Sequence, residues 1–123
     1  VDGIADNVPG QMNATQVVGN HLIVDHGTGE YSVLAHLRSG SVAVRTGDRV
    51  TRGQRLGECG NSGNSSEPHL HYQLQDGPEM GSSAGLPAQF TDYLADGQPV
   101  DRGEPVQGQA IRPAPATRQA RQP

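Results

Sequence analysis

The sequence predicts an all-β protein made of antiparallel sheets with many glycine-rich turns. Short apolar and β-branched runs alternate with turn segments, which is the pattern of strands joined in hairpins. The 123 residues include 17 Gly and 9 Pro, and only 3% of them are aromatic. No stretch of useful length shows the 3.6-residue apolar period of an amphipathic helix. Together these observations favour short strands over long helices.

The clearest strands are expected at residues 21–25 (HLIVD) and 31–37 (YSVLAHL). The turn residues 26–29 (HGTG) lie between them, so the two runs predict a hairpin. Residues 41–45 (SVAVR) and 69–75 (HLHYQLQ) alternate apolar and polar side chains, which predicts two half-buried strands. The segment CGNSGNSSEP before the last strand is rich in Gly, Asn and Ser, so it is expected to be a loop.

The length suits one domain, which we expect over residues 1–95, followed by an extension over residues 96–123. Residues 90–94 (FTDYL) are the last short segment with an ordered pattern. From about residue 112 the chain is rich in Pro, Ala, Gln and Arg, so the tail is expected to be disordered.

Composition and charge exclude several classes of protein. A net charge of −4 and a pI of about 5.6 give no reason to expect nucleic acid as a partner. No apolar run approaches the ~18 residues of a membrane span. The start, Val1-Asp2-Gly3, carries neither an initiator Met nor a signal peptide, and it is typical of the middle of a longer reading frame. The sequence leaves the oligomeric state open.

His69 and His71 are the strongest pair of candidate site residues. They lie two residues apart in an expected strand, so both rings face the same side, about 7 Å apart at the backbone. Such a pair can share one site, in which one imidazole binds a metal and the other acts as an acid or a base. The alternative is two surface histidines on a sheet, and the pair alone does not decide between the two.

A third histidine, His36, lies in the expected strand at residues 31–37. Regular alternation places it on the face of Ser32 and Leu34, and a lone histidine in a strand is usually structural or solvated. It becomes a site residue only if another strand brings it against His69 and His71.

Three other candidates are weaker. His21 and Asp25 form an H-x-x-x-D string, but four residues of strand separate them by roughly 13 Å at ~3.3 Å each, too far to share one zinc ion. His26 lies at the turn and is expected to hydrogen-bond to the loop. Cys59, the one cysteine, is expected to be a small buried hydrophobic residue rather than a nucleophile.

Three segments, taken in order, resemble the second half of the lysostaphin/LytM-type zinc metallopeptidase domain. They are GNHLIVDHGTGEYSVLAHL at 19–37, VRTGDRVTRGQRL at 44–56 and GNSGNSSEPHLHYQL at 60–74. The resemblance covers residues 1–76 well, and a looser match extends to Phe90. The run GNSGNSSEPHLHY together with A-H-L is specific to that family, whereas each alone is a modest signal.

The resemblance implies a zinc-dependent endopeptidase that cleaves peptide cross-links of bacterial peptidoglycan. Members of that family hold one Zn²⁺ with a His and an Asp of an early H-x-G-x-D segment and with the second His of H-x-H, which matches His71. The resemblance thus implies His71 as the metal ligand, with His36 and His69 as catalytic residues that assist the attacking water and stabilise the oxyanion. It also implies an extracytoplasmic location, in the periplasm, in the cell wall or secreted.

One part of the family's pattern is missing. The 123 residues contain no H-x-G-x-D string, so two of the three implied ligands are absent. We therefore expect a C-terminal part of the domain that is incomplete for catalysis, with the ligands upstream. The alternative is a catalytically inactive LytM-like module that binds and regulates cell-wall hydrolases. Residues 44–56 also resemble biotinyl and lipoyl carrier domains, but those require a lysine and all nine basic residues here are Arg.

Overall fold

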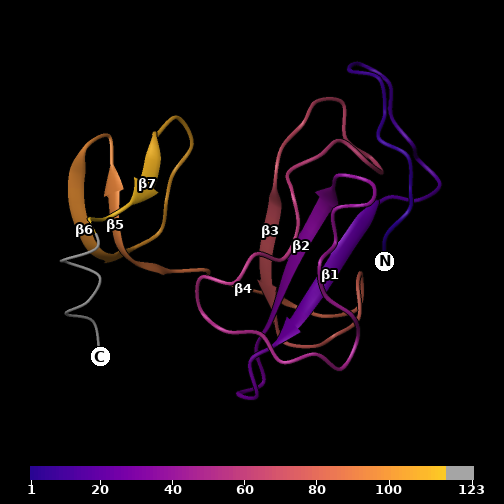
Figure 1. Ribbon diagram of the computed structural model, residues 1–123. Helices are drawn as coiled ribbons and strands as arrows, with labels where there is room; N and C mark the ends of the chain where they lie inside the picture. Colours follow the sequence, from indigo (N-terminus) through magenta and orange to yellow (C-terminus); the bar gives the residue numbers. More distant parts are fainter. Residues whose placement is uncertain (116–123) are drawn as a thin grey trace. The chain divides into compact units, whose positions relative to one another are not determined.

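The computed structural model describes residues 1–115 and divides into two compact units, Val1–Leu86 and Pro87–Pro123. All strand pairs in the described part are antiparallel, and no helix occurs there (Figure 1). The expected all-β fold is therefore confirmed. Accordingly, residues 1–115 contain no helix with the length and apolar character needed to cross a membrane.

The first unit contains a four-stranded sheet in the order β1-β2-β3-β4. Its strands are β1 (Asn20–Asp25), β2 (Tyr31–Leu37), β3 (His71–Gln75) and β4 (Gly85–Leu86). The first three confirm the strands expected from the alternating runs. Because β3 begins at His71, His69 lies just before it and is held by an isolated bridge to Gly60.

The expected hairpin between β1 and β2 is also confirmed. Asp25 pairs with Tyr31 at its end, and the Asp25 Oδ1 atom accepts the Gly27 N–H at 2.8 Å. The His26 N–H donates to the Glu30 carbonyl at 3.1 Å. Gly27 has a φ of 75°, in the left-handed region that glycine adopts without strain.

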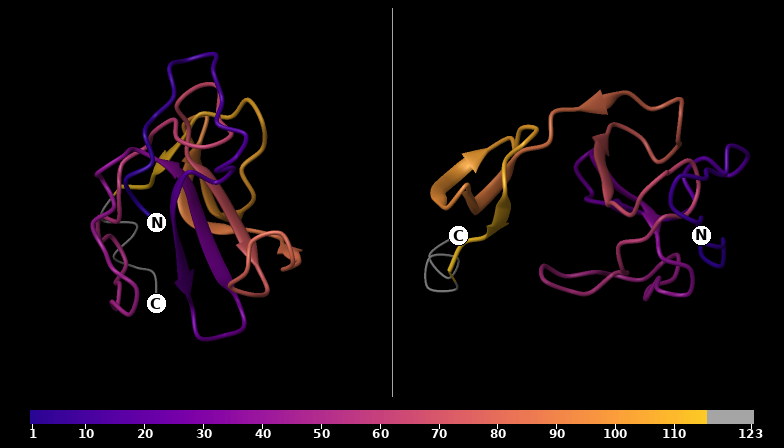
Figure 2. Two further views of the ribbon diagram at one scale, coloured as in Figure 1. Left: turned by 90° about the vertical axis from the view of Figure 1, so that its right-hand side faces the viewer. Right: turned by 90° about the horizontal axis from the view of Figure 1, so that it is seen from above.

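The core of the first unit lies along β2. Val33 and Ala35 are fully buried, and Leu37 is 3% exposed. The strand has β1 on one edge and β3 on the other, so its backbone is paired along both sides (Figure 2). The strand that carries His36 is therefore the buried centre of the first unit.

The loop over residues 59–70 packs closely against β2 and against the N-terminal segment. A Cβ atom at Gly60 would clash with the backbone of Arg38, and one at Gly63 would clash with the backbone of Gly19. The N-terminal segment runs beside this loop, where the Asn13 N–H donates to the Gly63 carbonyl at 3.0 Å (Figure 2). The two glycines thus allow the loop to approach the sheet closely.

The strand expected at residues 41–45 is not present, so that prediction is wrong. Both edges of β2 are already paired, and the segment follows a turn in which the Ser41 N–H donates to the Arg38 carbonyl at 3.1 Å. It is held instead by a hydrogen bond from the Ala43 N–H to the Leu56 carbonyl at 2.8 Å. Alternation alone cannot tell such an extended segment from a strand.

The second unit contains a three-stranded sheet in the order β6-β5-β7. Its strands are β5 (Phe90–Ala95), β6 (Gln98–Gly103) and β7 (Ile111–Pro113). The structure divides the chain after Leu86, whereas the sequence predicted a domain over residues 1–95, and this domain assignment stays a prediction. Of the tail expected to be disordered from about residue 112, Arg112 and Pro113 lie in β7, and residues 116–123 lie outside the described residues.

Candidate metal centre

Three histidines from two parts of the chain meet on one side of the first sheet. The ring centroids of His36 and His69 are 4.8 Å apart, those of His36 and His71 are 5.5 Å apart, and those of His69 and His71 are 6.5 Å apart. One ring nitrogen of each lies within 4.8 Å of the others, and within residues 1–115 these three form a group that could hold a metal ion. His36 comes from β2, His69 from the loop end and His71 from the start of β3.

A β-bulge in β2 brings His36 into this group. Asn20 pairs with Leu37 and Leu22 pairs with Leu34, so Ala35 and His36 together oppose the single residue between Asn20 and Leu22. At the bulge His36 has a φ of 59°, which is rare for a residue with a side chain.

The bulge changes the face on which the His36 ring lies. Ala35 pairs with His71, and paired residues on neighbouring strands share a face of the sheet. The extra residue turns His36 to that face, instead of to the face of Leu34 that regular alternation predicted. The condition for His36 as a site residue, that another strand brings it against His69 and His71, is therefore met.

We expect His36→Gly to unfold at higher urea concentration than His36→Ala, with a difference in unfolding free energy of about 1 kcal/mol. Both changes delete the imidazole, but only alanine keeps a Cβ in the left-handed conformation. Equilibrium urea denaturation of the two variants measures this difference. If the alanine variant were equally stable, the backbone at residue 36 would not be strained.

Each of the three rings has one nitrogen hydrogen-bonded within the protein. His36 Nδ1 lies 2.8 Å from the Ser62 carbonyl oxygen, and His69 Nδ1 lies 3.0 Å from the Glu67 carbonyl oxygen. His71 Nε2 lies 2.8 Å from the Gln73 Oε1 atom. Because carbonyl oxygens only accept, each of these ring nitrogens donates an N–H. In the neutral imidazoles the second nitrogen then keeps a lone pair.

His36 is the buried member of the group, with 6% of its surface exposed, whereas His69 and His71 are exposed. Burial lowers the pKa of His36 below its usual value, and repulsion from His69 and His71 lowers it further. The hydrogen bond to the Ser62 carbonyl opposes this shift. The lowered pKa favours the neutral imidazole, the form that can accept a proton.

A groove of about 440 Å³ adjoins the cluster. His36 and His71 lie on its wall, and Val17, Val18 and Met80 supply apolar surface. Gln73 and Asn64 add polar groups. The groove thus combines apolar surface with a few polar groups next to the imidazoles, which is the usual composition of a ligand site.

The three imidazoles fit a metal ion in their chemistry and in their hydrogen bonds. Metal-binding histidines usually donate their second N–H to a carbonyl or carboxylate, and all three of these rings donate in that way. Ligands of one tetrahedral zinc lie about 3.4 Å apart, given bonds of about 2.1 Å. The nitrogen atoms here spread over as much as 4.8 Å.

The weaker candidates remain outside the cluster. His21 Nδ1 is 2.9 Å from the Gly19 carbonyl oxygen, and neither His21 nor Asp25 belongs to the group of possible metal ligands among residues 1–115. His26 Nε2 bonds to Ser32 Oγ at 2.7 Å, so its ring contacts β2 rather than the loop that the sequence predicted.

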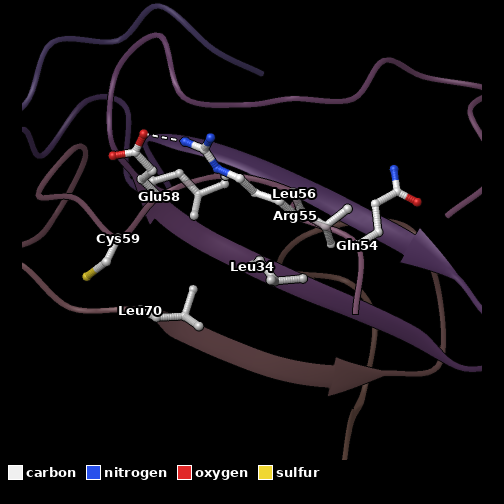
Figure 3. A pocket seen from close by; sticks show the side chains of 9 residues that line it. Leu34, Gln54, Arg55, Leu56, Glu58, Cys59 and Leu70 are labelled. Atoms are coloured by element: carbon white, nitrogen blue, oxygen red, sulfur yellow. Dashed lines mark hydrogen bonds and ion pairs between the residues drawn. The ribbon is translucent and has the colours of Figure 1, made fainter. Parts of the chain in front are cut away.

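Cys59 lies at a pocket distinct from the histidine groove. Leu34 and Leu70 line this pocket of about 290 Å³ together with Cys59 (Figure 3). The thiol is exposed, so the prediction of a buried cysteine is wrong. The neighbouring Gly60 is the buried residue, because it is the one packed against the backbone of β2.

Sequence reasoning missed the residues that orient the three rings. Ser62 and Glu67 act through backbone carbonyls, which no side-chain pattern reveals. Gln73 and Gln75 follow His71 at two-residue intervals, so they share its face of the strand. That interval was a usable signal for a hydrogen-bonded row beside His71.

Comparison with known sequences assigns most of the first unit to one family. The profile of Peptidase family M23 matches residues 7–84, which is more than half of the 123 residues. The peptidoglycan DD-endopeptidase ShyA of Vibrio cholerae is 41% identical over 56 residues, covering 46% of this chain and 13% of the relative. The cell division protein DipM of Caulobacter vibrioides is 33% identical over 72 residues, covering 58% of this chain and 12% of the relative.

A third relative, an uncharacterized metalloprotease of Buchnera aphidicola, is 32% identical over 73 residues, covering 59% of this chain and 18% of the relative. The chain thus spans between 12% and 18% of the length of these three relatives. No solved structure matches the chain significantly.

Proposed function

Because the chain belongs to Peptidase family M23, we propose that it forms part of a zinc-dependent endopeptidase that cleaves peptide cross-links of bacterial peptidoglycan. The observation that carries the proposal is the meeting of His36, His69 and His71 beside a groove, with one lone-pair nitrogen on each ring. Two further points support it: the family match and relatives named as peptidoglycan DD-endopeptidases.

In this proposal His71 is the metal ligand and the other two histidines act on the reacting groups. Zinc, when bound, supplies a Lewis acid that activates water and polarises the scissile carbonyl. His36, buried and neutral, accepts a proton through its Nε2 atom while the Ser62 carbonyl holds its Nδ1–H. His69, exposed and held at Nδ1 by the Glu67 carbonyl, presents Nε2 to a developing oxyanion or to the leaving amine.

We further propose that the other two zinc ligands come from outside these 123 residues. The LytM-type resemblance implies an H-x-G-x-D segment for them, and the chain contains no such string. His21 and Asp25 do not replace it, because neither side chain belongs to the cluster. The enzyme would act outside the cytoplasmic membrane, where peptidoglycan lies.

The test is to measure bound zinc and cleavage of cross-linked muropeptides in the full-length protein, in the wild type and in His71→Ala. The expected result is one zinc per wild-type molecule, with zinc and cleavage both lost in His71→Ala. The matched control is His21→Ala, which removes a half-buried imidazole outside the cluster and should retain both. Full zinc binding in His71→Ala would contradict the assigned ligand.

The cleavage assay, together with a binding assay, distinguishes the proposed enzyme from the alternative, a regulatory module. A wild-type protein without cleavage activity that still binds peptidoglycan or a wall hydrolase would be a regulatory LytM-like module. Tight one-to-one zinc binding by the 123-residue chain alone would instead show that its own residues complete the site, which would overturn the proposal of two outside ligands.

A further inference from the structure

A hydrogen-bonded row of two glutamine side chains ends on the His71 ring. Its inner member, Gln75, is 1% exposed, and its Nε2 atom donates to the Gly77 carbonyl at 2.9 Å and to the Glu79 carbonyl at 3.4 Å. Carbonyl oxygens have no hydrogen to donate, so the nitrogen of the Gln75 amide must be the atom that faces them. Its Oε1 atom therefore points the other way and can only accept.

Gln73 continues the row in the same direction. Its Nε2 atom donates to Gln75 Oε1 at 2.8 Å, which leaves Gln73 Oε1 directed at His71. Gln73 Oε1 lies 2.8 Å from His71 Nε2. Since this oxygen is also acceptor-only, the hydrogen in that bond belongs to the imidazole. The protonation of His71 Nε2 thus follows from backbone carbonyls at the far end of the row.

The neutral His71 ring has one N–H, so Nδ1 is left with its lone pair. His36 and His69 are held in the opposite sense, since in both rings it is Nδ1 that faces a carbonyl. We propose that Gln73 and Gln75 are positioning residues that hold His71 as its Nε2–H tautomer, which makes Nδ1 the metal-binding atom. This inference rests on the proposed metal site, but the tautomer itself exists without metal.

The geometry of the strand explains why these two residues serve this purpose. His71, Gln73 and Gln75 alternate along β3 and lie on one face of the sheet. Gln73 is opposite Val33 and Gln75 is opposite Tyr31 on β2, so the row runs along a paired, ordered surface. Burial of Gln75 makes reversal of its amide costly, because a reversed amide would direct its oxygen at two carbonyl oxygens.

The experiment compares the wild type with Gln73→Leu, Gln73→Glu and Gln75→Leu, using the full-length protein. The tautomer of His71 is determined from ring nitrogen-15 chemical shifts of the metal-free protein at a pH where the imidazole is neutral. Zinc affinity is then measured by competition with a chelator. The control is Gln54→Leu, which removes an exposed glutamine of the same compact unit outside the cluster.

We expect the wild type, Gln54→Leu and Gln73→Glu to show the Nε2–H tautomer, because a glutamate at residue 73 still accepts from Nε2. Gln73→Leu should show a mixture of tautomers. Its zinc affinity should be about 10- to 100-fold weaker, which is the usual effect of removing the hydrogen-bond partner of a metal-binding histidine. Gln75→Leu, which frees the Gln73 amide to reverse, should also show a mixture.

Two results would overturn the positioning role. One is a Gln73→Leu protein with the tautomer and zinc affinity of the wild type. The other is a Gln73→Glu protein that loses the Nε2–H tautomer as fully as Gln73→Leu. Absence of zinc binding in the wild type would overturn the proposed function instead, and the chemical shifts of the metal-free protein would still decide the role of the glutamines.

Discussion

Replacement of His69 by alanine is expected to lower the cleavage rate of cross-linked peptide by about 10²-fold or more while zinc remains bound. The ring lies in the cluster, with its centroid 4.8 Å from that of the His36 ring, yet the side chain is exposed and lies outside the buried core. Its loss should therefore remove a proton-transfer group without opening the core. Steady-state cleavage of a muropeptide dimer, together with zinc content, measures both effects.

His36→Ala should give the same combination of retained zinc and reduced cleavage, and His71→Ala should lose both. This contrast is the control for the His69 result, because a general loss of structure would remove zinc in all three variants. Full activity in His69→Ala or in His36→Ala would refute the catalytic role proposed for that residue. Loss of zinc in His69→Ala would show that His69 is a ligand rather than a flanking group.

A methyl group at Gly60 or Gly63 is expected to destabilise the protein by about 3 kcal/mol or more. At each position the added Cβ would meet backbone atoms of another segment, Arg38 in one case and Gly19 in the other, and backbone cannot move aside as a flexible side chain can. Gly63 also has a φ of 79°, which adds strain for alanine. A loss of this size is a large part of the unfolding free energy of a typical domain, which is roughly 5–15 kcal/mol.

The matched control is Gly85→Ala, because Gly85 has open space around the position of a Cβ and no left-handed φ. Its unfolding free energy should stay within about 0.5 kcal/mol of the wild-type value. Urea denaturation of the three variants tests the difference. Equal stability of Gly60→Ala and Gly85→Ala would mean that the loop does not need its close contact with the sheet.

Strands β1, β2 and β3 of the first sheet could be predicted because their side chains alternate and the turn between β1 and β2 is glycine-rich. The hairpin and β3 therefore follow from local pattern alone. Residues 41–45 show the same alternation without forming a strand, because a strand also has to pair with a neighbouring strand, and local pattern does not contain that information. Strand β6, with its Pro and Asp, lacks the β-branched run that makes a strand recognisable.

The site was predictable in its composition but not in its geometry. The H-x-H pair and the resemblance pointed to His36, His69 and His71, and the structure brings these three together. Regular alternation, however, placed His36 on the wrong face. A bulge arises when the two strands have different numbers of residues between two paired positions. That difference is a property of the pairing between β1 and β2, and neither strand shows it alone.

Because of the bulge, the site depends on the number of residues in β1 and β2 as well as on which residues they are. Two residues of β2 lie opposite one residue of β1, and this mismatch turns the His36 ring toward His71. One extra residue in β1 opposite the bulge would restore the regular ladder and return that ring to the other face, although every histidine would remain in the sequence. A search for active members of such a family should therefore compare the length of this hairpin as well as its motifs.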